Sequence, residues 1–269
     1  MPGGARGVGG VAGLIIVIVG AVFFHQDLSG LLGLGGSGGA NSQPQSQGQA
    51  IDPANDPQAE QVDFMSFLID DQQKVWADIF RAEGKRYRPA KLVLYTRGTD
   101  TGCGYGKSAI GPFYCPPDQK VYLDLDFFQV MRQRLGAPGD FAQAYVLAHE
   151  IGHHVQNLLG TNKSVDAQTA RAPSRKNELS VRLELQADCY AGIWAHSTRE
   201  RKLLEKGDVD ESLKAAWQIG DDTLQKSAGR KVSPDSFTHG SSEQRTRWFR
   251  RGLDSGRLDA CDTFSANPL

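Results

Sequence analysis

The stretch from Phe141 to Leu159 constrains the fold most, because it joins the periodicity of a buried helix to a run of chemically active side chains. Its apolar residues recur at helical spacing, at Phe141, Ala144, Tyr145, Leu147, Ala148, Val155, Leu158 and Leu159. Inside this helix lies His149-Glu150-Ile151-Gly152-His153, the pattern H-E-x-x-H. The domain is therefore expected to be built around one buried helix that carries polar groups into its interior.

Two histidines and a glutamate in this helix have the spacing of a zinc site. At 3.6 residues per turn, His149 and His153 stand one above the other on one face, where two imidazoles can bind one zinc ion. Glu150 projects toward the neighbouring side, where it can take a proton from a water activated by the metal. His154 lies about 100° around the helix from His153 and is expected to point away from the metal. The alternative is a polar helix face whose histidines are incidental.

A catalytic zinc needs a third protein ligand, and later acidic residues offer one. Glu184 follows His153 far enough along the chain for a turn and a second helix that returns antiparallel. Asp188 stands one helical turn after Glu184, so it could accept a hydrogen bond from a ligand imidazole while Glu184 binds the metal. The residues alone leave two alternatives open, a solvated carboxylate pair and Glu178 as the acidic ligand.

His239 is a further candidate, in a loop before a helix expected over Ser242–Gly252. A side chain in such a loop can reach into a cleft. A donor there, with Arg245 or Arg247 behind it, could stabilise the oxyanion of a tetrahedral intermediate. The alternative is a capping loop whose histidine only packs.

The remaining hydrophobic pattern predicts an α+β domain that is mainly helical. Two short strands are expected, at Leu92–Tyr95 and Val121–Leu125, on either side of a Gly- and Pro-rich loop. Helices are expected over Glu60–Glu83, Phe127–Leu135, Phe141–Leu159, Ser174–Glu205, Asp208–Gln225 and Ser242–Gly252. A few strands followed by many helices indicate the α+β class.

An uncharged apolar run, Gly7–Phe24, precedes this domain. It reaches the short end of the length that spans a hydrocarbon core, so residues 1–29 are predicted to form one transmembrane anchor. Arg6 precedes the run and no other Lys or Arg follows it closely, which predicts a cytoplasmic N-terminus and a domain outside the cell membrane. Residues 30–58 are predicted to be a flexible Gly/Ser/Gln-rich tether and residues 59–269 the folded domain. A cleaved signal peptide is the alternative, although no small-residue cleavage site follows closely.

The four cysteines, Cys103, Cys115, Cys189 and Cys261, suit two disulfides in an oxidising compartment. No Cys-x-x-Cys pair occurs, which argues against a structural zinc site. Cys103 and Cys115 flank a Gly- and Pro-rich stretch that can fold back. Cys103–Cys115 with Cys189–Cys261 is therefore the pairing predicted among those possible, and four reduced, buried thiols are the alternative.

The charge balance argues against one class of partner. Lys and Arg number 30, Asp and Glu number 31, and the formal net charge is -1. Because proteins that bind nucleic acid usually carry a basic excess, no nucleic-acid partner is expected.

Longer stretches around these residues resemble the neutral zinc metallopeptidases of bacteria. The resemblance is close from Tyr95 to Gly252 and looser over the anchor and tether. It is carried by Cys103-Gly104, Gly111–Pro116, Val121–Asp124, Ala148–Asn157, Glu184–Gly192 and Phe237–Gly240. The family is similar in plan to the gluzincin peptidases, among them the membrane proteases that process prenylated proteins. Those enzymes pair H-E-x-x-H with a later Glu-x-x-x-Asp and a late histidine before an arginine.

The resemblance implies a zincin-like domain in which Glu184 is the third ligand of one catalytic Zn²⁺ and Asp188 orients a ligand imidazole. It makes His239 an active-site donor, although Gly240 stands where the prenyl-protease pattern favours proline. The activity implied is hydrolysis of peptide bonds in a protein or peptide substrate, with Glu150 as the base. Two other functions stay open, a catalytically idle envelope scaffold that keeps zinc for stability and hydrolysis of a cell-wall amide.

Overall fold

The computed structural model describes residues 58–96, 98–107, 111–132 and 139–269. The predicted anchor and all but the last residue of the predicted tether lie outside these ranges. Among the helices of the described ranges, none combines the length and the apolar character needed to cross a membrane.

Helices make up most of the described chain. They are α2 (Ala59–Ala82), α3 (Leu125–Val130), α4 (Asp140–Leu159), α5 (Thr161–Arg171), α6 (Lys176–Glu200), α7 (Asp208–Gln218), α8 (Asp221–Ser227) and α9 (Ser242–Ser255). Short 3-10 turns lie at Pro173–Arg175, Pro234–Ser236 and Leu258–Cys261. Together with the small sheets described next, they confirm the predicted α+β class with mainly helical content.

The strands form two small sheets. In the first, β1 (Lys91–Tyr95) and β5 (Lys120–Asp124) pair in parallel, and β4 (Phe113–Cys115) joins β5 antiparallel, in the order β1-β5-β4. In the second, β2 (Gly98–Thr101) and β3 (Gly104–Lys107) form an antiparallel hairpin. The two predicted strands correspond to β1 and β5. The other three were predicted to be loop, because strands of three or four residues are too short to show a clear alternation.

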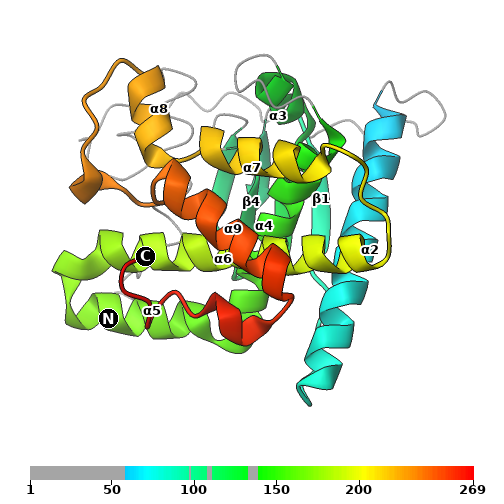
Figure 1. Ribbon diagram of the computed structural model, residues 1–269. Helices are drawn as coiled ribbons and strands as arrows, with labels where there is room; N and C mark the ends of the chain where they lie inside the picture. The colour runs from blue at the N-terminus through cyan, green and yellow to red at the C-terminus, as the bar shows by residue number, and fades with distance from the viewer. Residues whose placement is uncertain (1–57, 97, 108–110, 133–138) are drawn as a thin grey trace, which may run out of the picture.

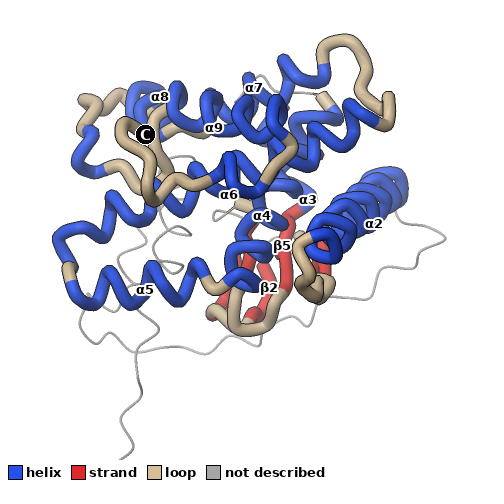
Figure 2. Tube along the Cα trace, turned by 60° about the horizontal axis from the view of Figure 1, so that its bottom comes forward, coloured by secondary structure: helices blue, strands red, loops and turns tan. Residues whose placement is uncertain are grey.

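The helices enclose α4, which runs through the middle of the domain. Both views place the strands between α2 on one side and α5 on the other (Figure 1, Figure 2). Helix α4 contacts β4, α2, α6 and α7, and α9 packs along α6. The H-E-x-x-H residues therefore lie on the most central helix of the described chain.

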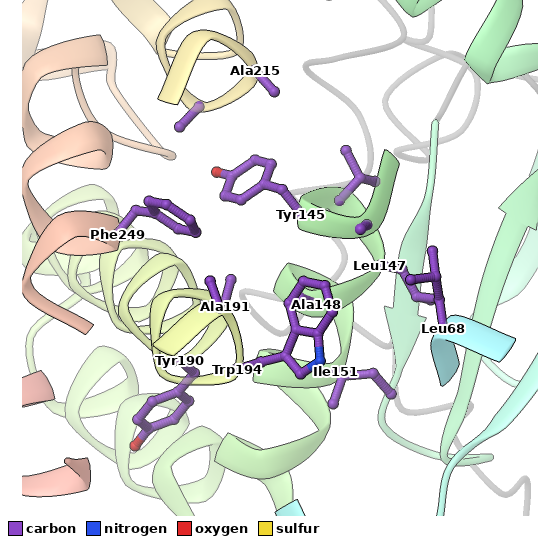
Figure 3. Close-up of a cluster of buried hydrophobic side chains, with 14 of the residues drawn as sticks. Leu68, Tyr145, Leu147, Ala148, Ile151, Tyr190, Ala191, Trp194, Ala215 and Phe249 are labelled. Atoms are coloured by element: carbon purple, nitrogen blue, oxygen red, sulfur yellow. The ribbon is translucent and has the colours of Figure 1, made fainter. Parts of the chain in front are cut away.

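Apolar packing from several helices fixes the position of α4. Figure 3 shows Tyr145, Leu147, Ala148 and Ile151 of α4 together with Leu68 of α2, Tyr190, Ala191 and Trp194 of α6, Ala215 of α7 and Phe249 of α9, all of them buried. The rings of Tyr145 and Phe249 meet edge to face with 5.4 Å between their centroids. A close-packed interior tolerates little rearrangement, so the polar face of α4 is held in a fixed orientation.

Two helices differ from the prediction for physical reasons. The helix predicted over Asp208–Gln225 is two helices, α7 and α8, which break at Gly220. A β-carbon on Gly220 would lie 2.3 Å from the backbone nitrogen of Ser242, so only glycine fits this crossing. The break turns α8 so that Asp221 reaches the loop before α9. Helix α5 was not predicted because it is polar and buries only Val165, which leaves no apolar period to detect.

Both predicted disulfides are present. Cys103–Cys115 joins the turn of the β2–β3 hairpin to β4, and Cys189–Cys261 joins α6 to the C-terminal 3-10 turn. The predicted pairing is therefore confirmed. The second bond anchors the C-terminal turn to the middle of α6, close in sequence to Glu184 and Asp188.

Candidate metal centre

His149, His153 and Glu184 bring three potential ligand atoms together between α4 and α6. All three side chains are buried, and their ligand atoms lie within 4.8 Å of one another. Glu184 Oε2 is 3.2 Å from His149 Nε2, and Glu184 Oε1 is 3.4 Å from His153 Nε2. Two ligand atoms about 2.1 Å from a tetrahedral ion are about 3.4 Å apart. The spacing and the two-nitrogen, one-carboxylate set therefore fit Zn²⁺.

Gly152 allows the two helices to approach closely at this point. A β-carbon there would lie 2.9 Å from the carbonyl oxygen of Ala187 and 3.1 Å from its Cα atom. Backbone atoms cannot move aside as the end of a side chain can, so a larger residue would push α6 away from α4. The glycine between the two histidines thus brings Glu184 within reach of them.

Asp188 fixes the orientation of His149. Its Oδ1 lies 2.8 Å from His149 Nδ1 and accepts the Tyr145 hydroxyl at 2.6 Å. Arg245 donates to both carboxylate oxygens, through Nε at 2.8 Å and Nη2 at 2.9 Å. Burial by itself would raise the pKa of Asp188, but the Arg245 charge, His149 and the hydrogen bonds hold it at about 2. The ionised carboxylate keeps the proton of His149 on Nδ1 and leaves Nε2 for a metal.

Two neighbouring candidates lie outside this cluster. His154 points away, as predicted, because its Nε2 donates to the Arg88 carbonyl at 2.6 Å and its Nδ1 accepts from the Tyr114 hydroxyl at 3.0 Å. The carboxylate of Glu178 instead pairs with two arginines near the surface of α6. Of the two acidic residues considered as a ligand, only Glu184 faces the histidines.

Glu150 is buried beside the cluster. The backbone of Tyr114, in β4, lies near its carboxylate and favours the ionised form. Burial raises the pKa of Glu150, and the nearby His153 and His149 oppose that rise. A carboxyl whose pKa lies nearer neutrality is suited to accepting and returning a proton.

Comparison with known proteins identifies a family whose description names zinc. A model of the family described as "Putative neutral zinc metallopeptidase" matches residues 1–264. The chain belongs to this family. It is 48% identical over 259 residues to the uncharacterized protein YpfJ of Escherichia coli K12, covering 96% of this chain and 87% of YpfJ. It is 42% identical over 195 residues to the uncharacterized protein Rv2575 of Mycobacterium tuberculosis H37Rv, covering 68% of this chain and 65% of Rv2575. No solved structure matches the chain.

His239 reaches the surroundings of the same centre from the loop between α8 and α9. Its Nδ1 is 3.1 Å from Asp221 Oδ1, and Asp221 Oδ2 accepts the backbone N–H groups of Thr238, His239 and Gly240. Burial lowers the pKa of His239, but the hydrogen bond that its Nδ1 donates to Asp221 and the charge of Glu184 raise it above its usual value. Its Nε2 is buried and has no hydrogen-bond partner. The Nε2 atom of His239 is therefore free to form a hydrogen bond with a molecule that binds near Glu184.

Arg245 and Asp221 differ from what the sequence indicated. Arg245 was expected behind His239 as support for an oxyanion, but it is buried and paired with Asp188. Arg247, the other arginine considered there, is exposed. The role of Asp221 was not predicted, because the apolar residues before and after it keep helical spacing and indicated one continuous helix. The one available signal was Gly220 followed by acidic residues, a pattern typical of a helix start.

Proposed function

We propose that this protein is a membrane-anchored zinc metallopeptidase whose zincin-like domain hydrolyses peptide bonds of protein or peptide substrates outside the cytoplasm. The observation that carries the proposal is the convergence of buried His149, His153 and Glu184, with the buried carboxylate of Glu150 beside them. Burying charged groups costs free energy unless a partner compensates them. A bound divalent cation would supply that compensation, and membership of the family supports the choice of zinc.

The residues around the centre have complementary tasks in such a reaction. Zn²⁺ held by His149, His153 and Glu184 would polarise the peptide carbonyl and lower the pKa of water toward neutrality. Glu150 would accept the proton of the attacking water and return it to the leaving amine as the C–N bond breaks. His239 would donate from Nε2 to the oxyanion that forms on the substrate, held in place by Asp221.

The proposed location rests on the sequence and on the cysteines. The apolar run Gly7–Phe24 has the length of a short membrane span, with Arg6 on its expected cytoplasmic side. Both disulfides of the domain suit an oxidising compartment. We therefore assign residues 1–29 to the anchor and place the catalytic domain beyond the membrane.

Substituting Glu184 by alanine is expected to remove most of the bound zinc, because the remaining two imidazoles give an incomplete ligand set. Zinc per chain, measured by atomic emission on the purified full-length protein, checks this. The matched control is E178A, which removes a carboxylate from the same helix outside the cluster and should keep the wild-type content. Wild-type zinc content in E184A would remove Glu184 from the ligand set.

Substituting His239 by alanine should lower kcat by about 10²–10³-fold while zinc content stays unchanged, since the loss is that of one oxyanion donor. D221N should produce a smaller loss, because His239 remains but is held less firmly. H196A is the control, as His196 lies twelve residues beyond Glu184 in α6 and hydrogen-bonds the Leu253 carbonyl. Full activity in H239A would show that His239 only packs.

Zinc stoichiometry combined with a proteome-wide cleavage screen tests the proposal as a whole. The full-length protein is compared with its chelator-treated form and with E150Q. Cleavage products that require both zinc and Glu150 would support a peptidase. One zinc per chain without any cleavage would favour the idle, zinc-stabilised scaffold, and a chain that takes up no zinc would contradict both.

A further inference from the structure

A chain of buried amides links His153 to the C-terminal turn. His153 Nδ1 lies 2.9 Å from Gln156 Oε1, and Gln156 Nε2 donates to the Leu183 carbonyl at 2.7 Å. The same Gln156 Nε2 is 3.2 Å from Gln186 Oε1, and Gln186 Nε2 donates to the Cys261 carbonyl at 3.1 Å. These contacts run from α4 across α6 to the turn that the second disulfide anchors.

The backbone carbonyls of Leu183 and Cys261 fix the direction of every hydrogen bond in this series of amides. A carbonyl oxygen only accepts, so the amide nitrogens of Gln156 and Gln186 must face Leu183 and Cys261 respectively. The amide oxygen of each glutamine then points the opposite way, toward His153 Nδ1 for Gln156 and toward Gln156 Nε2 for Gln186. The orientation of an amide is assigned in this way, from the hydrogen bonds that it must satisfy. Gln156 Oε1 therefore faces His153 and requires a proton on Nδ1. The lone pair of His153 is left on Nε2, the atom that faces Glu184.

Burial makes this arrangement firm. Gln156 is 0% exposed and Gln186 is 7% exposed, so water does not readily replace either partner. Turning the Gln156 amide around would place its oxygen against the Leu183 carbonyl oxygen and Gln186 Oε1. Buried acceptors would then face one another without a donor, which costs about 1–3 kcal/mol. Leu183 directly precedes Glu184 in α6, so the bond from Gln156 also ties α4 to α6 beside the third candidate ligand.

We propose that Gln156, held by Gln186 and the C-terminal turn, is the positioning residue that selects the nitrogen His153 presents to the metal. His149 is oriented by the carboxylate of Asp188, whereas His153 is oriented by a neutral amide. The amide fixes the tautomer without adding another negative charge to a centre that already holds Glu150, Glu184 and Asp188. The inference rests on the metal site of the proposed function and does not depend on catalysis.

Zinc dissociation constants of the full-length protein, measured by competition with a chelator, test this. Q156M keeps the length of the side chain and removes its hydrogen bonds, and should weaken zinc binding by about 10–100-fold. Q186M should weaken it less, because Gln186 acts through Gln156. The matched control is Q143M, since Gln143 is also buried in α4 but pairs with Gln61 away from the cluster. Q143M should bind zinc as wild type does.

A second measurement uses only the wild-type protein. ¹H–¹⁵N NMR of the zinc-loaded form should show a protonated Nδ1 on His153 and a metal-bound Nε2. A wild-type His153 that binds zinc through Nδ1, or a Q156M protein that binds zinc as tightly as Q143M, would overturn the inference and leave the proposed function intact. A wild-type protein without zinc affinity would overturn the proposed function together with it.

Discussion

Replacing Glu150 by glutamine is expected to lower kcat by about 10²–10⁴-fold while the zinc content stays at the wild-type level. Glutamine has nearly the shape of glutamate but cannot accept and return a proton at neutral pH. Glu150 is not one of the three converging ligands, so the donor set for the metal remains complete in E150Q. Hydrolysis and metal content should therefore separate in this variant.

The surroundings of Glu150 make the substitution a fair test. The Tyr114 backbone lies near this side chain, and an amide oxygen at position 150 can accept from an N–H group as the carboxylate can. The control is E205Q, on an exposed loop residue, which should cleave as wild type does. Both variants are assayed on a substrate taken from the cleavage screen, with zinc measured on the same samples. Wild-type cleavage by E150Q would show that another group acts as the base.

The part of the centre that lies within one helical turn could be predicted from the sequence. His149 and His153, like Glu184 and Asp188, are four residues apart in continuous helices, so each pair shares a face whatever the helices pack against. The fold class followed in the same way from the long apolar periods. The loop position of His239 was also recognisable, because a clear helix follows it.

The rest depends on contacts between distant segments, which no local pattern encodes. Gln156 resembles any polar residue near the end of a helix until Leu183 and Gln186 of α6 are placed opposite it. Asp221 contacts His239 only because the chain breaks between α7 and α8 at Gly220. The backbone of Ser242 packs so closely there that no side chain would fit. Gln156 and Asp221 each orient a histidine, and each is itself held by hydrogen bonds to backbone carbonyls or N–H groups. Such partners leave no signature in the identity of neighbouring residues.

Removing the guanidinium of Arg245 is expected to lower the free energy of unfolding by about 3–5 kcal/mol, because R245M strands a buried carboxylate. Asp188 is 0% exposed, and Arg245 binds both of its oxygens. Urea unfolding of the zinc-loaded full-length protein measures the change. R247M, an exposed arginine of the same helix, is the control and should stay within about 0.5 kcal/mol of wild type. R245M/D188N, which removes the stranded charge as well, should recover part of the loss.

The loss in R245M should also depend on pH with a defined sign. In the wild-type protein the folded-state pKa of Asp188 is about 2, below the value of about 3.9 for an unfolded aspartate. Its ionised form therefore contributes stability above about pH 4, and the contribution is lost as the pH falls toward 2. Without Arg245, burial raises the pKa of Asp188, so protonation in acid relieves the stranded charge. The difference in free energy of unfolding between wild type and R245M should become smaller as the pH falls from 7 to 3. A difference that stays constant would mean that Arg245 stabilises the fold by packing rather than by its charge.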